Sequence, residues 1–466
     1  MRWHVHWLWV ALLAPPAVLA LPQLENRFHA IHGNDGFLNF AYAHSLLQSG
    51  DLDFADDYSI FDLIGESRGY GFRMRDTPSD PVTGRPVNRY GWGCSVLWSP
   101  FLILAQALSA LARLGVPEHN WGPPSLSAFH FLAVRLGTAL WAVLGLAGLA
   151  AVARRHLFTE DEGTSDETDH RHDSSVIVLA VLALIACTNF GFYIYLHPSM
   201  STAPAFGLAG LLIWQIDRIT RQRTPGRLFA LGFTAGLLVA TRYGDAAFVA
   251  GLLPALWAAN REFKGASAGL QRPVTIPSLL AGLLPIAAIQ MAVWWYLYGS
   301  PISGPTPYLS DDYTWTIPGR HSLEVLFSTH HGWVTWHPAV LLGLVGVVMF
   351  VRDRSIPLWL RLTPMAILLQ LLAVGAWPVW AGGASFGGRL MATALSVVFF
   401  GLVVLIRAMI RRWGRGAAIA TLSLLALWNV NLLAQYGLEM IPRQAPVSPI
   451  DVLRNTGALL ARLFGG

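Results

Sequence analysis

Long apolar runs, separated by short arginine-rich segments, dominate this sequence. Runs long enough to cross a bilayer, which takes about 20 residues, begin near residue 3 and recur near 127–153, 175–196, 199–216, 276–298, 357–378, 390–410 and 416–434. Shorter runs lie near 228–241, 246–259 and 338–351. A chain that is 54% hydrophobic and 13% charged is too apolar for a soluble multidomain protein. The pattern predicts an all-α, polytopic transmembrane helix bundle.

The segments between these runs carry much of the positive charge. Arginines cluster there around residues 154–155, 218–227, 352–354 and 407–415. Cytoplasmic loops of membrane proteins carry an excess of basic residues, so the clusters predict which side each connection faces. They account for the net charge of +5 without a nucleic-acid partner. The use of arginine in place of lysine, of which Lys264 is the only one, favours a GC-rich bacterial genome.

One further run, from Ser95 to Gly115, decides the topology. If it crosses the membrane, the clusters at 154–155 and 218–227 face outwards; if it lies along the outer interface, every cluster faces inwards. The positive-inside rule favours the second arrangement. The prediction is a single integral domain over residues 1–466 with about 11 spans, an inside N-terminus and an outside C-terminus. Its first outer loop, 22–126, holds interfacial helices, and 299–337 forms a second long outer loop.

The first outer loop offers a carboxylate close to the membrane surface. Asp35 precedes a predicted amphipathic helix from Gly36 to Ser49, which Gly50 would end. Asp is a favoured N-cap residue, and an ionised carboxylate there also suits a general base for an acceptor hydroxyl. The two roles are compatible and both stay open. Asp56 and Asp57 belong to an acidic stretch that indicates either an acceptor- or cation-binding loop or a solvated turn.

Polar residues also gather in the later outer loops. His197 lies between two spans with almost no spacer, which suits a structural interface histidine or a contact to an acceptor. Arg242 and Asp245 share a tight turn on the outer side, against the charge rule, so the guanidinium needs an anionic partner. Asp245, a lipid headgroup and a substrate phosphate are three open alternatives for that partner.

Two more segments complete this polar set. The stretch 330–338 contains three histidines, but their spacing matches no standard zinc motif, so we assign no metal to them. Trp333 and Trp336 suit an aromatic belt or a platform for a sugar ring. The stretch Gly382–Arg389 offers backbone amides and one guanidinium before an apolar run, which suits an oxyanion or a phosphate.

In these segments the chain resembles the GT-C superfamily of integral membrane glycosyltransferases, in pattern the protein O-mannosyltransferases and aminoarabinose transferases. The resemblance rests on residues 34–35, 42–47, 50–54, 327–338 and 383–389, and it extends over most of the chain. Many members have an acidic residue in the next outer loop, where this chain has His197, which argues against a two-carboxylate metal site. A divalent cation stays an open alternative as a cofactor.

The resemblance implies a bacterial cytoplasmic-membrane enzyme whose active site faces the periplasm or cell exterior. Such an enzyme transfers a sugar from a polyprenyl-phosphate donor to a glycan, lipid or protein acceptor, and a single displacement predicts inversion. Asp35 takes the position of the first-loop catalytic acid. The other candidates fall into two groups: Arg242, Arg389, His331 and His337 for the donor phosphate, and Asp56, Asp57, His197, Trp333 and Trp336 for the sugar or acceptor.

Two alternatives share the same sequence features. A transporter or flippase for a glycolipid would also have many helices, but it would place charged or broken helices near the midplane and often show paired repeats. A relative that binds a lipid-linked sugar without catalysing transfer would have the same outer-loop residues. The concentration of polar residues in the outer loops favours the enzyme over the transporter.

Overall fold

The described part of the chain is built from helices. The computed structural model describes residues 2–20, 29–31, 33–67, 73–113, 126–158, 167–262, 275–302, 304 and 316–464. Within these ranges the β-type pairing is limited to an isolated bridge between Ser79 and Pro86, so the predicted all-α class is confirmed. The longer helices of the bundle are α1 (Arg2–Leu19), α6 (Ala128–His156), α7 (Glu167–Cys187), α8 (Thr202–Arg221), α9 (Pro225–Thr241), α12 (Thr275–Tyr298), α15 (Pro338–Arg352) and α18 (Leu395–Gly437).

Four segments among the described residues are long and apolar enough to cross a membrane. They are Gly93–Ala112, Ala128–His156, Ile276–Tyr298 and Arg389–Gly437. Shorter apolar helices lie beside them at Leu8–Leu19, Asp173–Cys187, Pro225–Thr241, Pro338–Arg352 and Leu358–Val374. The chain therefore has the helices of a membrane protein, and the number of about 11 crossings stays a prediction.

Several predicted runs differ from the helices that form. The run 175–196 ends as an α-helix at Cys187 and continues as a π-helix, η3 (Phe192–Leu196). The run 246–259 divides into α10 (Ala246–Gly251) and α11 (Leu253–Glu262), and 357–378 divides into α16 (Leu358–Arg361) and α17 (Pro364–Val374). The two runs after 390 form two helices on either side of a kink at Gly414, whose φ is 84°, and α18 (Leu395–Gly437) includes both.

Charged side chains pair near both ends of α8. At one end, Asp217 near the end of α8 accepts hydrogen bonds from Arg221 and contacts His156 of α6. At the other end, Met200 just before α8 lies 3.9 Å from Arg389, which pairs with Asp35. The 20 residues of α8 separate these ends by about 30 Å. The arginine connectors and Asp35 thus lie on opposite ends, and the compartment that each end faces stays a prediction.

Glycines allow the central helices to pack backbone against backbone. A Cβ on Gly145 of α6 would lie 2.6 Å from the Cα of Gly207 in α8. A Cβ on Gly346 of α15 would lie 1.9 Å from the carbonyl oxygen of Gly401 in α18. Small residues at such crossings are how membrane helices gain close packing, since lipid provides no hydrophobic drive between them.

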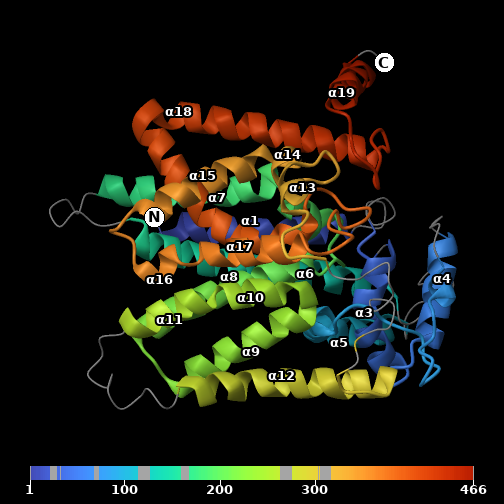
Figure 1. Ribbon diagram of the computed structural model, residues 1–466. Coiled ribbons are helices and arrows are strands. Elements are labelled where there is room, and N and C mark those ends of the chain that lie inside the picture. Colours follow the sequence, from blue (N-terminus) through green and yellow to red (C-terminus); the bar gives the residue numbers. More distant parts are fainter. Residues whose placement is uncertain are drawn as a thin grey trace.

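Three helices of the predicted first outer loop cover the Asp35 end of the bundle. They are α3 (Gly33–Gln48), α4 (Ala55–Ser67) and α5 (Gly93–Arg113), and Figure 1 shows α3 and α4 lying across the ends of the long helices. On α5, the Trp98 indole donates to the Thr138 hydroxyl at 2.9 Å and Gln106 contacts His130 at 2.9 Å.

These contacts keep α5 beside the first part of α6, which continues to His156. Such a position suits the predicted interfacial helix, although its segment Gly93–Ala112 is long and apolar enough to cross. Its interfacial role therefore stays a prediction.

Candidate active site

Helix α3 holds Asp35 at the entrance of the bundle. The helix begins at Gly33, so Asp35 is its third residue and not its N-cap. The Asn39 side chain donates to the Asp35 carbonyl oxygen at 2.8 Å and to the Ser199 carbonyl oxygen at 3.3 Å, which ties α3 to the segment before α8. Gly50, with a φ of 75°, follows the helix as predicted. The predicted amphipathic character is wrong, because every residue from 36 to 45 is buried.

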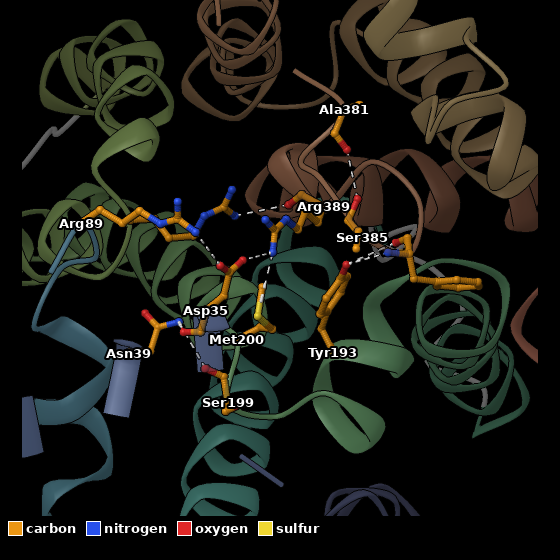
Figure 2. Close-up of polar contacts among 12 residues, drawn as sticks. Asp35, Asn39, Arg89, Tyr193, Ser199, Met200, Ala381, Ser385 and Arg389 are labelled. Atoms are coloured by element: carbon orange, nitrogen blue, oxygen red, sulfur yellow. Dashed lines mark hydrogen bonds and ion pairs between the residues drawn. The ribbon is translucent and has the colours of Figure 1, made fainter. Parts of the chain in front are cut away.

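The Asp35 carboxylate lies between two guanidiniums (Figure 2). Arg389 Nη1 is 2.7 Å from Asp35 Oδ2, and Arg89 Nη2 is 3.4 Å from Asp35 Oδ1. The Asp35 side chain is 19% exposed and that of Arg389 is 16% exposed. The pair is therefore largely enclosed, yet a small group can still reach the carboxylate.

The charge state of Asp35 follows from these neighbours. Burial raises the pKa of Asp35. The charges of Arg389 and Arg89 and a hydrogen bond from Tyr90 together lower it by more than burial raises it, so the pKa lies below the usual 3.8. Asp35 is consequently ionised at neutral pH. A carboxylate held by two guanidiniums is a weak base, and it becomes a stronger one only when a guanidinium turns to another anion.

A glycine-rich loop brings Arg389 to this position. Gly382, Gly383 and Gly387 have φ values of 77°, 65° and 65°, a region that costs other residues free energy. Within the loop, the Phe386 amide donates to the Tyr193 hydroxyl at 3.0 Å. The 3₁₀-helix η8 (Arg389–Ala394) starts directly after it. The conformation of the loop therefore positions the Arg389 guanidinium against Asp35 of α3.

Arg242 lies beside Arg389 and is held by backbone and carboxylate oxygens. Its Nη1 and Nη2 atoms donate to the carbonyl oxygens of Arg389 and Leu390, each at 3.4 Å. Its Nε lies 3.8 Å from Asp245 Oδ2. Of the three alternatives for its anionic partner, Asp245 is thus in contact, and the guanidinium still lines the cavity described below.

Asp245 is completely buried and serves as an acceptor for two further elements. Its Oδ1 accepts from Gln370 Nε2 at 3.0 Å and from Thr393 Oγ1 at 3.1 Å. Burial raises the pKa of Asp245, and Arg242 with the two hydrogen bonds only partly offsets this. The residue links the turn after α9 to α17 and η8, and so fixes the backbone that carries Arg389.

These side chains open into a cavity of about 1880 Å³. Its charged and polar lining includes Asp35, Arg89, Arg242, Arg389 and His197. Much of the remaining wall is apolar and comes from several helices, including Val239, Trp294, Val374, Val430 and Leu433. A cavity of this kind can take a ligand with an anionic head and a long hydrocarbon chain.

Four predicted ligand residues of the second outer loop lie outside the cavity lining. Trp333 and Trp336 are 0% and 3% exposed and pack in the core. Burial lowers the pKa of His331 to about 4 and that of His337 to about 3. His331 Nε2 contacts the Arg443 carbonyl oxygen at 2.9 Å, and His337 Nδ1 contacts Asn429 at 3.1 Å. These neutral histidines support the wall, and their proposed contacts to phosphate stay predictions.

The acidic stretch after α3 folds as a turn that leads into α4, and Asp56 and Asp57 lie in the first turn of that helix. Asp53 Oδ1 accepts from the Ala55 amide at 3.2 Å, at the start of α4. Asp57 is buried and pairs with His44 Nδ1, whereas Asp56 is exposed. Neither Asp56 nor Asp57 lines the cavity. Among the described residues, no three His, Cys, Asp or Glu side chains form a group that could hold a metal ion.

Sequence reasoning missed some residues of this site. Arg89 pairs with Asp35, and Tyr193 orients the loop before Arg389. A signal for Arg89 was present, because it is an arginine of the predicted outer loop and, like Arg242, breaks the charge rule. Tyr193 lies in an apolar run, and nothing in the sequence distinguishes it from a core residue.

Comparison of the chain with known proteins adds no relative to these observations. No protein-family model matches it, and no curated protein matches it. The cavity and its side chains are therefore the basis for assigning a function.

Proposed function

We propose that this protein is a membrane glycosyltransferase of GT-C type, which transfers a sugar from a polyprenyl-phosphate donor to an acceptor hydroxyl. One observation carries the proposal: the ionised Asp35 and the guanidiniums of Arg89, Arg242 and Arg389 are among the groups that line one cavity, whose other walls are largely apolar. The apolar walls suit the polyprenyl chain, and the guanidiniums suit its phosphate, since a planar guanidinium can bind two phosphate oxygens.

The proposed reaction is a single displacement at the anomeric carbon. The acceptor oxygen attacks this carbon while its proton passes to Asp35, and the bond between the carbon and the phosphate oxygen breaks. The bonding electrons leave with the polyprenyl phosphate, whose growing negative charge is met by Arg389 and Arg242. The attack comes from the face opposite the leaving group, so the anomeric configuration inverts.

The ion pair of Asp35 with Arg389 gives this reaction an order of events. The guanidinium neutralises the carboxylate at 2.7 Å, which makes Asp35 a weak base. A donor phosphate that draws Arg389 away leaves Asp35 with the longer contact to Arg89 at 3.4 Å and the hydrogen bond from Tyr90. Its basicity then rises, so the base becomes competent only when the donor is bound.

The proposal also includes the orientation of the bundle. About 11 spans would place the arginine connectors in the cytoplasm and the cavity on the periplasmic or outer face of a bacterial cytoplasmic membrane. An impermeant thiol reagent added from outside should label a cysteine placed at Asp56, which is exposed near the cavity end. It should not label one at Arg221, and the opposite pattern would contradict the orientation.

The experiment that tests the activity is the substitution Asp35→Asn in membranes supplied with a polyprenyl-phosphate sugar. We expect the transfer rate to fall by about 10²–10⁴-fold, the usual contribution of a general base. Binding of polyprenyl phosphate should persist, because the guanidiniums remain. The matched control is Asp56→Asn, an exposed acid of the same outer loop that does not line the cavity. A full rate in Asp35→Asn would remove this residue from the chemistry.

A further inference from the structure

The C-terminal helix α19 (Pro449–Phe464) is attached to the bundle along one side only. Gln435 of α18 donates to the Val452 carbonyl oxygen at 3.0 Å, and Asn431 donates to the Thr456 hydroxyl at 2.9 Å. Asn455 donates to the Met440 carbonyl oxygen at 2.8 Å. These bonds fix how α19 is rotated about its own axis, and so they fix which residues face away.

A second side of α19 is apolar and uncovered. Ile450, Leu453 and Leu460 are 68%, 67% and 49% exposed, and their spacing places them on one stripe of a helix. Asp451, Arg454 and Ala458 are exposed on a third side, whose centre is about 120° around the helix from that of the stripe. The helix thus has a docked side, an apolar side and a polar side.

The apolar side continues a surface that would face lipid. Leu424, Leu427 and Leu438, on or just after the last part of α18, are 68%, 65% and 59% exposed. Figure 1 shows α19 lying across the end of this part of α18 and extending away from the bundle, at the end where α3 and α4 lie. A helix in this position runs along the plane of a bilayer that contains α18.

We propose that α19 is a membrane-surface helix, whose apolar stripe of Ile450, Leu453 and Leu460 inserts at the boundary between headgroups and acyl chains. Three features favour lipid as its occupant: the separate polar side, the continuity with the apolar face of α18, and the position at the end of the spanning helix. Helices with these properties lie in the interface with the polar side in water.

This placement has a consequence for the cavity. The segment between α18 and α19 contributes Leu438, Glu439, Arg443 and Gln444 to the cavity lining. The Val447 amide of this segment donates to the carbonyl oxygen of Thr329, in the predicted second outer loop, at 3.3 Å. Anchoring α19 therefore fixes one rim of the cavity at headgroup level. That this rim receives a lipid-linked donor rests on the proposed function, whereas the anchoring does not.

The test uses an environment-sensitive fluorophore on single cysteines of the full-length protein in lipid nanodiscs. The native thiols of Cys94 and Cys187 are buried and do not compete for the label. Leu460→Cys reports on the apolar stripe. Ala458→Cys is the matched control, since two residues advance about 200° around a helix and Ala458 is also exposed.

We expect a blue-shifted emission at position 460 that lipids with a nitroxide near the headgroup quench, and a water-like emission at 458 that aqueous iodide quenches. Equal, water-like emission at both positions would overturn the proposal. Protection of position 460 from both quenchers would also overturn it, because a protein surface would then cover the stripe. Neither measurement depends on sugar transfer, so a failure here is distinguishable from a failure of the proposed activity.

Discussion

Two carboxylates near opposite ends of α8 have similar partners and different surroundings. Asp35 contacts Arg389 at 2.7 Å and Arg89 at 3.4 Å, and Arg389 also contacts Met200, just before α8. Asp217, in the last part of α8, contacts Arg221 at 2.7 Å and His156 at 2.7 Å. Judged by distances alone, either group could be called an active-site acid.

Access and the origin of the partners separate them. The Asp35 side chain is 19% exposed and lines the large cavity, whereas that of Asp217 is 3% exposed and does not line it. Arg221 is one helical turn from Asp217, and His156 ends the adjacent α6. The partners of Asp35 come instead from non-helical segments and a 3₁₀-helix: Arg89 precedes α5, and Arg389 follows the glycine-rich loop at the start of η8. Asp217 therefore joins neighbouring helices, while the Asp35 site is assembled where a ligand can enter.

The first prediction tests the Asp35 site with the substitution Arg389→Gln. Loss of the guanidinium that meets the leaving phosphate should lower the transfer rate by about 10²–10³-fold, the effect of removing one preorganised charge-stabilising donor. The measurement is the steady-state rate with a polyprenyl-phosphate sugar. Arg389→Lys, which keeps the charge without the planar fork, should recover only part of the rate. Full activity in Arg389→Gln would contradict the proposed role.

The second prediction is that Asp217→Asn lowers the stability of the protein. It keeps the shape of the side chain but removes the charge that His156 and Arg221 share in a buried position. We expect the free energy of unfolding to fall by about 1–3 kcal/mol, the usual cost of a buried group left without its partner. The measurement is Tm in detergent. The transfer rate at low temperature should stay near that of the unchanged protein, and a selective loss of rate would put Asp217 in the chemistry.

The sequence predicted the class of fold because apolar length and arginine position are local properties. Each apolar run needs only its own residues to be recognised. The same reasoning failed where a run contains a break: the π-helix after Cys187 and the division of 357–378 depend on tertiary contacts. The division between the runs 390–410 and 416–434 was predicted, because the arginines around Gly414 interrupt the apolar pattern locally, and α18 has a kink at Gly414.

The candidate site was predicted in part for a similar reason. Asp35, Arg242 and Arg389 were singled out because each is a polar residue at an unusual place in the predicted topology, and all three line one cavity. Trp333 and His337 were singled out as side chain types that often bind ligands, yet both are buried in the wall. Residue type says little about which way a side chain points, and only the packing around it decides.

The third prediction concerns the acidic side of the pH profile. Because Arg389 and Arg89 lower the pKa of Asp35, the carboxylate stays ionised as the pH falls, until the lowered pKa is reached. Arg89→Gln removes one of these charges, so the acidic limb of the rate should move to higher pH. The measurement is the transfer rate against pH. Arg85→Gln, in the same loop but over the Tyr296 ring, is the control and should leave the limb in place.

The smallest expected effect is that of Arg221→Gln, at the other end of α8. Arg221 is 43% exposed and four residues after the buried Asp217, so water screens its charge and we expect it to contribute about 1 kcal/mol or less. Asp217 keeps His156 at 2.7 Å, so the change in Tm should be well below that of Asp217→Asn. It should shrink further in high salt, which screens an exposed charge. An equal loss of Tm in the two variants would mean that the pair of Arg221 with Asp217 within α8, and not the contact of Asp217 with His156 of α6, carries the stabilisation.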